Sequence, residues 1–167
     1  MIHVLIASLA LGAIMTLGDF AWSALQIRHR VASGVVHGAV MCLCLGLAVG
    51  VRARKPVVGA IAGLVIGVVA AATFYALAPV LRWGAMFPAW MLLWILFAVL
   101  QHRLHRTETL GAALIRGTVA AWLSGVAFYL ISGIWTRGGD PHLARNFASW
   151  SFAFLPGFLA LFFSRRV

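Results

Sequence analysis

Residues 57–81 read VVGAIAGLVIGVVAAATFYALAPVL and contain no charged side chain. A helix of this length rises about 1.5 Å per residue, which is enough to cross the roughly 30 Å hydrocarbon core of a bilayer. Inside lipid every backbone N–H and C=O must be satisfied within the segment, and a helix does so. The stretch therefore predicts a transmembrane helix.

The same kind of apolar run recurs along the rest of the chain. These runs are too uniformly apolar for barrel strands, which alternate over about 10 residues. Short connections leave no room for a second domain, so we expect one all-α, polytopic transmembrane helical bundle over residues 1–167. The alternative is five spans, with residues 84–100 or 147–163 re-entrant. The expected spans are residues 2–25, 33–51, 57–81, 84–100, 110–135 and 147–163.

The composition agrees with membrane residence: 63% of residues are apolar, 10% are charged, and the mean hydropathy is +1.02. A soluble domain averages about 45–50% apolar and about 25% charged residues. The net charge of +10 comes largely from the connections between runs. Basic residues there meet anionic lipid headgroups, so the expected partner is the bilayer and not nucleic acid.

The basic residues also predict an orientation, because the side with more Lys and Arg faces the cytoplasm. The larger group places both termini in the cytoplasm, in what we interpret as a bacterial cytoplasmic membrane. We interpret residues 2–25 as the first span and not as a cleaved leader, because the stretch lacks a basic start and its apolar run is too long. The larger group comprises Arg52, Arg54, Lys55, Arg103, Arg106, Arg165 and Arg166; the smaller comprises Arg28, Arg30, Arg82, Arg137 and Arg145.

Small residues recur every fourth position in three of the runs, and such stripes let transmembrane helices approach closely. We therefore expect the second, third and fifth spans to form the tight centre of the bundle, with Cys42 as one more small residue. The stripes are Gly34, Gly38, Cys42, Gly46 and Gly50; Gly59, Gly63, Gly67 and Ala71; and Ala113, Gly117, Ala121 and Gly125.

The fourth and sixth runs carry aromatic stripes instead, for which two interpretations remain open. The rings face lipid or its interface, or they form a wall for a flat apolar ligand such as a quinone, tetrapyrrole or sterol. The stripes are Phe87, Trp90, Trp94 and Phe97 in the fourth run, and Phe147, Trp150, Phe154, Phe158 and Phe162 in the sixth.

Polar residues within spans are costly and therefore point to function. Asp19 lies about ten residues before the first turn near His29, and His37 lies about eight after it. The two side chains are then at similar depth on adjacent helices, where each charged form would stabilise the other. Such a pair could relay a proton, hold a cationic ligand or lock two helices together.

Arg116 lies about one and a half turns inside the fifth run. Its side chain either extends to the interface or holds an anionic group of a ligand, with Trp94 at comparable depth for a cation–π contact.

A metal site is a further hypothesis, because His37, Met41 and Cys44 share one helical face. Imidazole, thioether and thiol together suit Cu(I), although Met and Cys are also ordinary packing residues. Haem ligation would need a second intramembrane histidine beside His37. The sequence leaves the cofactor undetermined.

No phosphate-binding loop, HExxH motif or nucleophile–base–acid set is present, which argues against an enzyme. We expect a protein that binds or transports a small, largely apolar or cationic ligand within the bundle, alone or as the membrane component of a larger transporter. The alternatives are a non-catalytic accessory or structural subunit of a membrane complex and a small membrane oxidoreductase with bound haem, quinone or metal. The possible protein partners are other membrane subunits or further copies of the same chain. The predicted ligand-binding or proton-relay residues are Asp19, His37, Arg116, Trp90 and Trp94.

Overall fold

The computed structural model describes residues 2–25, 29–105, 108–132 and 142–162. These residues contain no strand and form six α-helices, with one 3-10 turn between the third and the fourth. The all-α prediction is thus confirmed. The elements are α1 (Ile2–Ala24), α2 (Arg30–Arg52), α3 (Pro56–Leu81), η1 (Arg82–Ala85), α4 (Met86–His105), α5 (Leu110–Ser132) and α6 (Leu143–Phe162).

Five of these helices, α1 to α5, are long and apolar enough to cross a bilayer, so the chain is a membrane protein. The sixth helix, α6, has 20 residues and begins with a polar turn that contains Arg145 and Asn146. This helix packs against α1 and α5. The orientation of the termini stays a prediction.

Several helix ends differ from the apolar runs that predicted them. Helix α2 begins three residues early, α6 begins four residues early, and α4 continues to His105 instead of ending at residue 100. A helix continues past its apolar run because its backbone stays hydrogen-bonded while long basic side chains reach the headgroups. The expected span ends at residues 133–135 and 163 lie outside the described residues.

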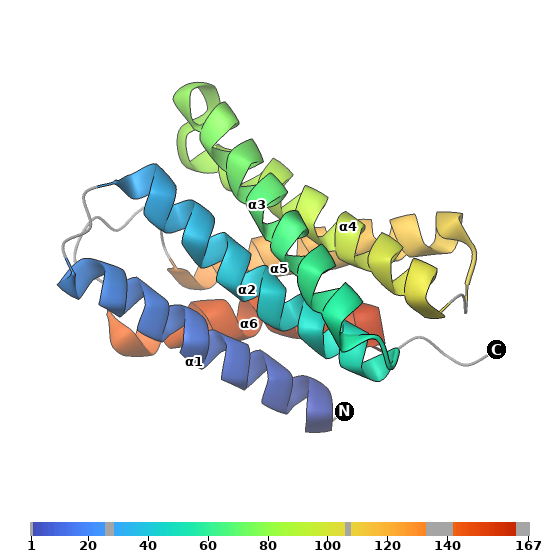
Figure 1. Cartoon of the computed structure of the whole chain (residues 1–167). Coiled ribbons are helices and arrows are strands. Elements are labelled where there is room, and N and C mark those ends of the chain that lie inside the picture. The colour runs from blue at the N-terminus through green and yellow to red at the C-terminus, as the bar shows by residue number, and fades with distance from the viewer. Residues whose placement is uncertain (1, 26–28, 106–107, 133–141, 163–167) are drawn as a thin grey trace.

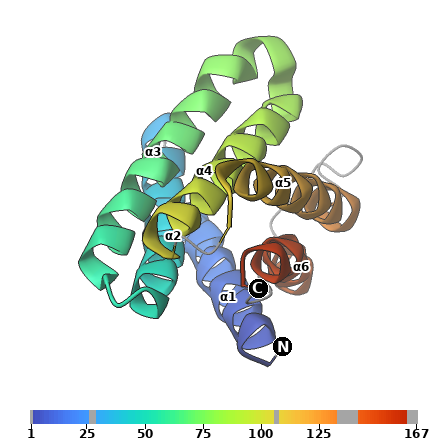
Figure 2. The same cartoon turned by 90° about the vertical axis from the view of Figure 1, so that its right-hand side faces the viewer.

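The helices are arranged as an incomplete ring. Figure 2 shows α1, α6, α5, α4, α3 and α2 following one another around the bundle. Each neighbouring pair packs extensively except α1 and α2, whose contacts are sparse. Figure 1 shows α1 and α2 side by side along one face, with the N-terminus at the far end of α1 from the α1–α2 connection.

Glycines hold α2 and α3 together, as the four-residue spacing predicts. A Cβ added to Gly63 would collide with the carbonyl oxygen of Cys42 and with the Cα of Gly46. A Cβ on Gly46 would likewise collide with the backbone of Gly59 and Gly63. The two backbones are thus in direct contact, and Cys42, fully buried, acts as a small packing residue.

The prediction that the fifth span joins this centre is wrong. Helix α5 packs on α4 and α6, on the opposite side of the ring from α2 and α3. The small-residue stripe of α5 packs closely against α4 instead, since a Cβ on Gly117 would collide with the Cα of Ile95 in α4. The short connection between α4 and α5 favours this sequential pairing, and the spacing of small residues does not specify the partner.

Most of the two aromatic stripes lies in the core of the bundle, whereas Phe147, near the start of α6, is 36% exposed. Trp94, Phe97, Phe154 and Phe158 are fully buried between α4 and α6, so the lipid-facing interpretation is wrong for them. Gly157 makes room for the indole of Trp94, with which any Cβ would collide. Edge-to-face geometry between Trp94 and Phe158, with ring centroids 6.3 Å apart, adds to the packing. The side chain of Phe162 lies outside the described residues.

Candidate functional site

A cleft of about 400 Å³ lies inside the bundle, bounded by five of the six helices. This volume falls within the range of about 300–1,000 Å³ that is typical of small-molecule sites. Its lining residues are Asp19 of α1; Ser33, Gly34, His37, Gly38, Met41 and Cys42 of α2; Gly67, Ala70, Ala71, Phe74 and Tyr75 of α3; Met86, Ala89, Trp90 and Leu93 of α4; and Trp150 of α6.

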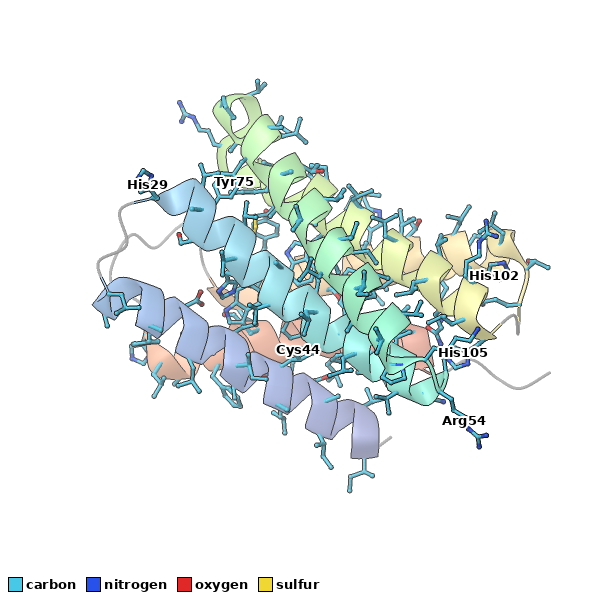
Figure 3. All side chains as sticks on the ribbon, in the orientation of Figure 1. His29, Cys44, Arg54, Tyr75, His102 and His105 are labelled. Carbon is cyan, nitrogen blue, oxygen red and sulfur yellow. The ribbon has the colours of Figure 1, made fainter. Side chains whose placement is uncertain are left out.

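The cleft occupies one end of the bundle. Figure 3 shows Tyr75 at the same end as His29, whereas His105 and Arg54 lie at the opposite end. Asp19 is five residues from the end of α1, which at 1.5 Å per residue places it about 8 Å inside the helix end. The lining extends inward only as far as Leu93, beyond which fully buried side chains fill the core.

Asp19 is held in place by two donors from α6. Trp150 Nε1 donates to Asp19 Oδ2 at 2.8 Å, and Asn146 Nδ2 donates to the same oxygen at 3.3 Å. The two donors are one helical turn apart and therefore lie on one face of α6. The second carboxylate oxygen, Oδ1, lies 3.9 Å from His37 Nε2, which is too long for a hydrogen bond.

His37 completes the group from α2. Its ring packs on the indole of Trp150, with centroids 5.7 Å apart, and its Nε2 atom is buried without a hydrogen-bond partner. Counting residues from the turn near His29 correctly places Asp19 beside His37 on adjacent helices. The functional role of the two side chains stays a prediction.

We expect Asp19 and His37 to be energetically coupled. Asp19→Asn and His37→Ala should each lower the free energy of unfolding. The loss in the double variant should be smaller than the sum of the two single losses by about 0.5–1 kcal/mol, because the interaction between the two side chains, 3.9 Å apart, can be lost only once. Chemical unfolding of the four proteins in detergent, followed by tryptophan fluorescence, measures the difference. Strictly additive losses would show that the two side chains do not interact.

Arg116 belongs to a different part of the molecule. Its Nη1 donates to the carbonyl oxygens of Ala160 (3.0 Å) and Leu161 (2.8 Å) in α6, and to Gln101 Oε1 of α4 (3.1 Å). Its Nη2 forms an ion pair with Glu108, and Gln101 Nε2 also donates to Leu161. Arg116 therefore caps the C-terminal end of α6 and does not line the cleft.

The two tryptophans predicted as ligand contacts separate in the structure. Trp90 lines the cleft, with its ring 6.3 Å from that of Trp150. Trp94 is fully buried one turn further along α4, stacked beside Trp90.

The proposed metal ligands also separate. His37 and Met41 line the cleft, but the cysteine beside them is Cys42 and not Cys44. Within the described part of the chain, no three His, Cys, Asp or Glu side chains come together. The described residues therefore contain no cluster of side chains that supports a copper site.

Three residues of the cleft group were not among the ligand-binding residues predicted from the sequence, although Trp150 was part of the aromatic stripe. Asn146 and Trp150 hold the carboxylate, and Tyr75 places its hydroxyl over Gly34 at the cleft wall. The spacing of Asn146 and Trp150 on one face of α6 was a usable signal. The missing information was that α6 faces α1, because these helices are the first and last in the chain.

The chain matches no protein family, no curated protein and no solved structure. The site itself is therefore the basis for assigning a function.

Proposed function

We propose that the protein binds a small lipophilic amine, in its protonated form, within the membrane-embedded cleft. The observation that carries the proposal is the carboxylate of Asp19, held by two donors at the edge of an apolar, aromatic pocket. A carboxylate inside a span is costly unless it has a partner. A ligand cation would supply that partner.

The hydrogen bonds of Asp19 leave one of its two carboxylate oxygens for a ligand. Trp150 Nε1 and Asn146 Nδ2 are both donors, and both reach Oδ2. Ionised carboxylates are acceptors only, and donors bonded to them strengthen this form. Since Oδ2 takes both donors, Oδ1 is the oxygen left for a ligand.

The rest of the cleft suits an apolar body attached to a cation. Trp90, Trp150, Phe74 and Tyr75 supply aromatic rings, and Met41 and Leu93 close the inner end. Aromatic faces attract cations, and the attraction increases when water is excluded.

The geometry favours amines that carry N–H groups. Asp19 Oδ1 and His37 Nε2 are 3.9 Å apart, so one nitrogen can lie within hydrogen-bond distance of both. When the ammonium lies between them, the imidazole is neutral with its proton on Nδ1, and Nε2 is then a second acceptor for the ligand. A primary or secondary ammonium can donate to both atoms, whereas a quaternary ammonium has no N–H to donate.

Three nitroxides of closely similar shape test the proposal: 4-amino-TEMPO, its alcohol analogue 4-hydroxy-TEMPO and the quaternary 4-trimethylammonio-TEMPO. Each quenches tryptophan fluorescence, and two tryptophans line the cleft. With the protein in lipid nanodiscs, we expect saturable quenching by the primary amine, weaker binding of the quaternary cation and the weakest binding of the alcohol.

The Asp19→Asn variant should bind 4-amino-TEMPO at least about 30-fold more weakly, because loss of a desolvated charge partner costs about 2–5 kcal/mol. Thr16→Val is the matched control, since Thr16 is buried one turn away on α1 and donates to the carbonyl oxygen of Gly12. Equal affinity for the amine and the alcohol, or full affinity in Asp19→Asn, would overturn the proposal.

A further inference from the structure

A second, smaller pocket lies on the other side of His37. It has a volume of about 160 Å³ and is lined by Ile14, Met15, Gly18, Ala21 and Leu25 of α1 and by His37 and Val40 of α2. His37 is the residue that this pocket shares with the cleft. The two hollows are therefore separated at the imidazole ring.

The smaller pocket is on the outer side of the α1–α2 seam. Ile14, Leu25 and Val40 are 41%, 67% and 46% exposed, so in a bilayer their side chains meet lipid. Met15, by contrast, is buried toward the bundle. The pocket is thus a crevice that runs from the lipid-facing surface toward His37.

The seam is also the loosest contact between neighbouring helices. Helix α1 packs along α6 but only sparsely on α2, although a short connection joins α1 to α2. At the seam, Gly18 presents no side chain: a Cβ there would lie 3.1 Å from His37 Nδ1. The imidazole itself therefore closes the gap between the helices.

We propose that the ligand enters the cleft laterally from the bilayer, between α1 and α2, when the His37 side chain turns aside. This inference rests on the proposed function. A lipophilic amine partitions into the bilayer with its ammonium at headgroup level and its apolar body among the acyl chains. Asp19 is only about 8 Å from the helix end, so such a ligand meets the seam at the depth of the carboxylate.

Filling the outer crevice tests the route without altering the cleft. Val40 and Ala21 line the crevice and not the cleft, so Val40→Phe and Ala21→Phe each place a ring in the path. Val65→Phe is the control, because Val65 is similarly exposed on α3, away from the seam. Stopped-flow quenching by 4-amino-TEMPO in nanodiscs gives the association and dissociation rates.

We expect both plugged variants to slow association and dissociation about tenfold or more and to leave the dissociation constant unchanged. Rates equal to those of Val65→Phe would overturn the lateral route and leave the proposed function intact. Absence of saturable quenching in the wild-type protein would instead overturn the proposed function. Thermal melting identifies any variant that fails to fold, and the second plugged variant then decides the outcome.

Discussion

Arg116→Met is expected to lower the free energy of unfolding by about 3–5 kcal/mol, the cost of removing one partner of a buried, hydrogen-bonded ion pair. The Arg116 side chain is only 15% exposed and links Glu108 of the α4–α5 connection to the last carbonyls of α6. Its loss leaves the Glu108 carboxylate without its cation. For a chain of this length the change corresponds to a melting temperature lower by about 6 °C or more.

Arg103→Met is the matched control, because Arg103 is an exposed arginine at the same end of the bundle. It should melt close to the wild-type protein. Combining Arg116→Met with Glu108→Gln should recover part of the loss, since no unpaired carboxylate then remains. Equal melting temperatures for Arg116→Met and Arg103→Met would show that the α6 cap contributes nothing to stability.

Gly63→Ala is expected to lower the free energy of unfolding by loosening the α2–α3 pair. The added methyl group would meet the backbone of Cys42 and Gly46, so the helices must separate along their shared glycine stripe. Overpacking of this kind costs about 1–3 kcal/mol or more. A larger side chain, as in Gly63→Leu, should prevent folding, which fluorescence-detected size exclusion would record as lost monodisperse protein.

Gly111→Ala is the control, since the structure leaves open space around a Cβ at Gly111, at the start of α5. Alanine is favoured over glycine in helices by about 1 kcal/mol. Gly111→Ala should therefore keep or raise the melting temperature while Gly63→Ala lowers it. If the two variants melt alike, α2 and α3 are not in backbone contact.

The helices themselves were predictable from the sequence because hydropathy and length determine what lies in a bilayer. The partners of each helix were not. The spacing of small residues correctly predicted that α2 and α3 pack closely at Gly46 and Gly63. It also predicted that α5 joins these two helices, whereas Gly117 of α5 packs against α4. The aromatic stripes were equally ambiguous, because the spacing of a residue such as Trp94 along the helix is the same whether its ring is buried in a core or exposed to lipid. In the structure, Trp94 is buried.

The candidate site was only partly predictable. Asp19 and His37 are on consecutive antiparallel helices, so counting from the turn between them gives their relative depth. The donors from α6 are far away in sequence, and only the closure of the ring by α1 and α6 brings Trp150 to Asp19. Arg116 was correctly placed within the fifth span, but its partners on α6 follow from tertiary packing alone.

The most direct test of the amine-binding cleft is a crystal structure grown from a lipidic mesophase with a brominated alkylamine, whose bromine is located by anomalous scattering. We expect the ammonium nitrogen about 3 Å from Asp19 Oδ1 and the bromine among the aromatic rings of the cleft. A cleft filled by a lipid acyl chain, with the bromine found elsewhere and nothing polar beside Asp19, would contradict the proposed function.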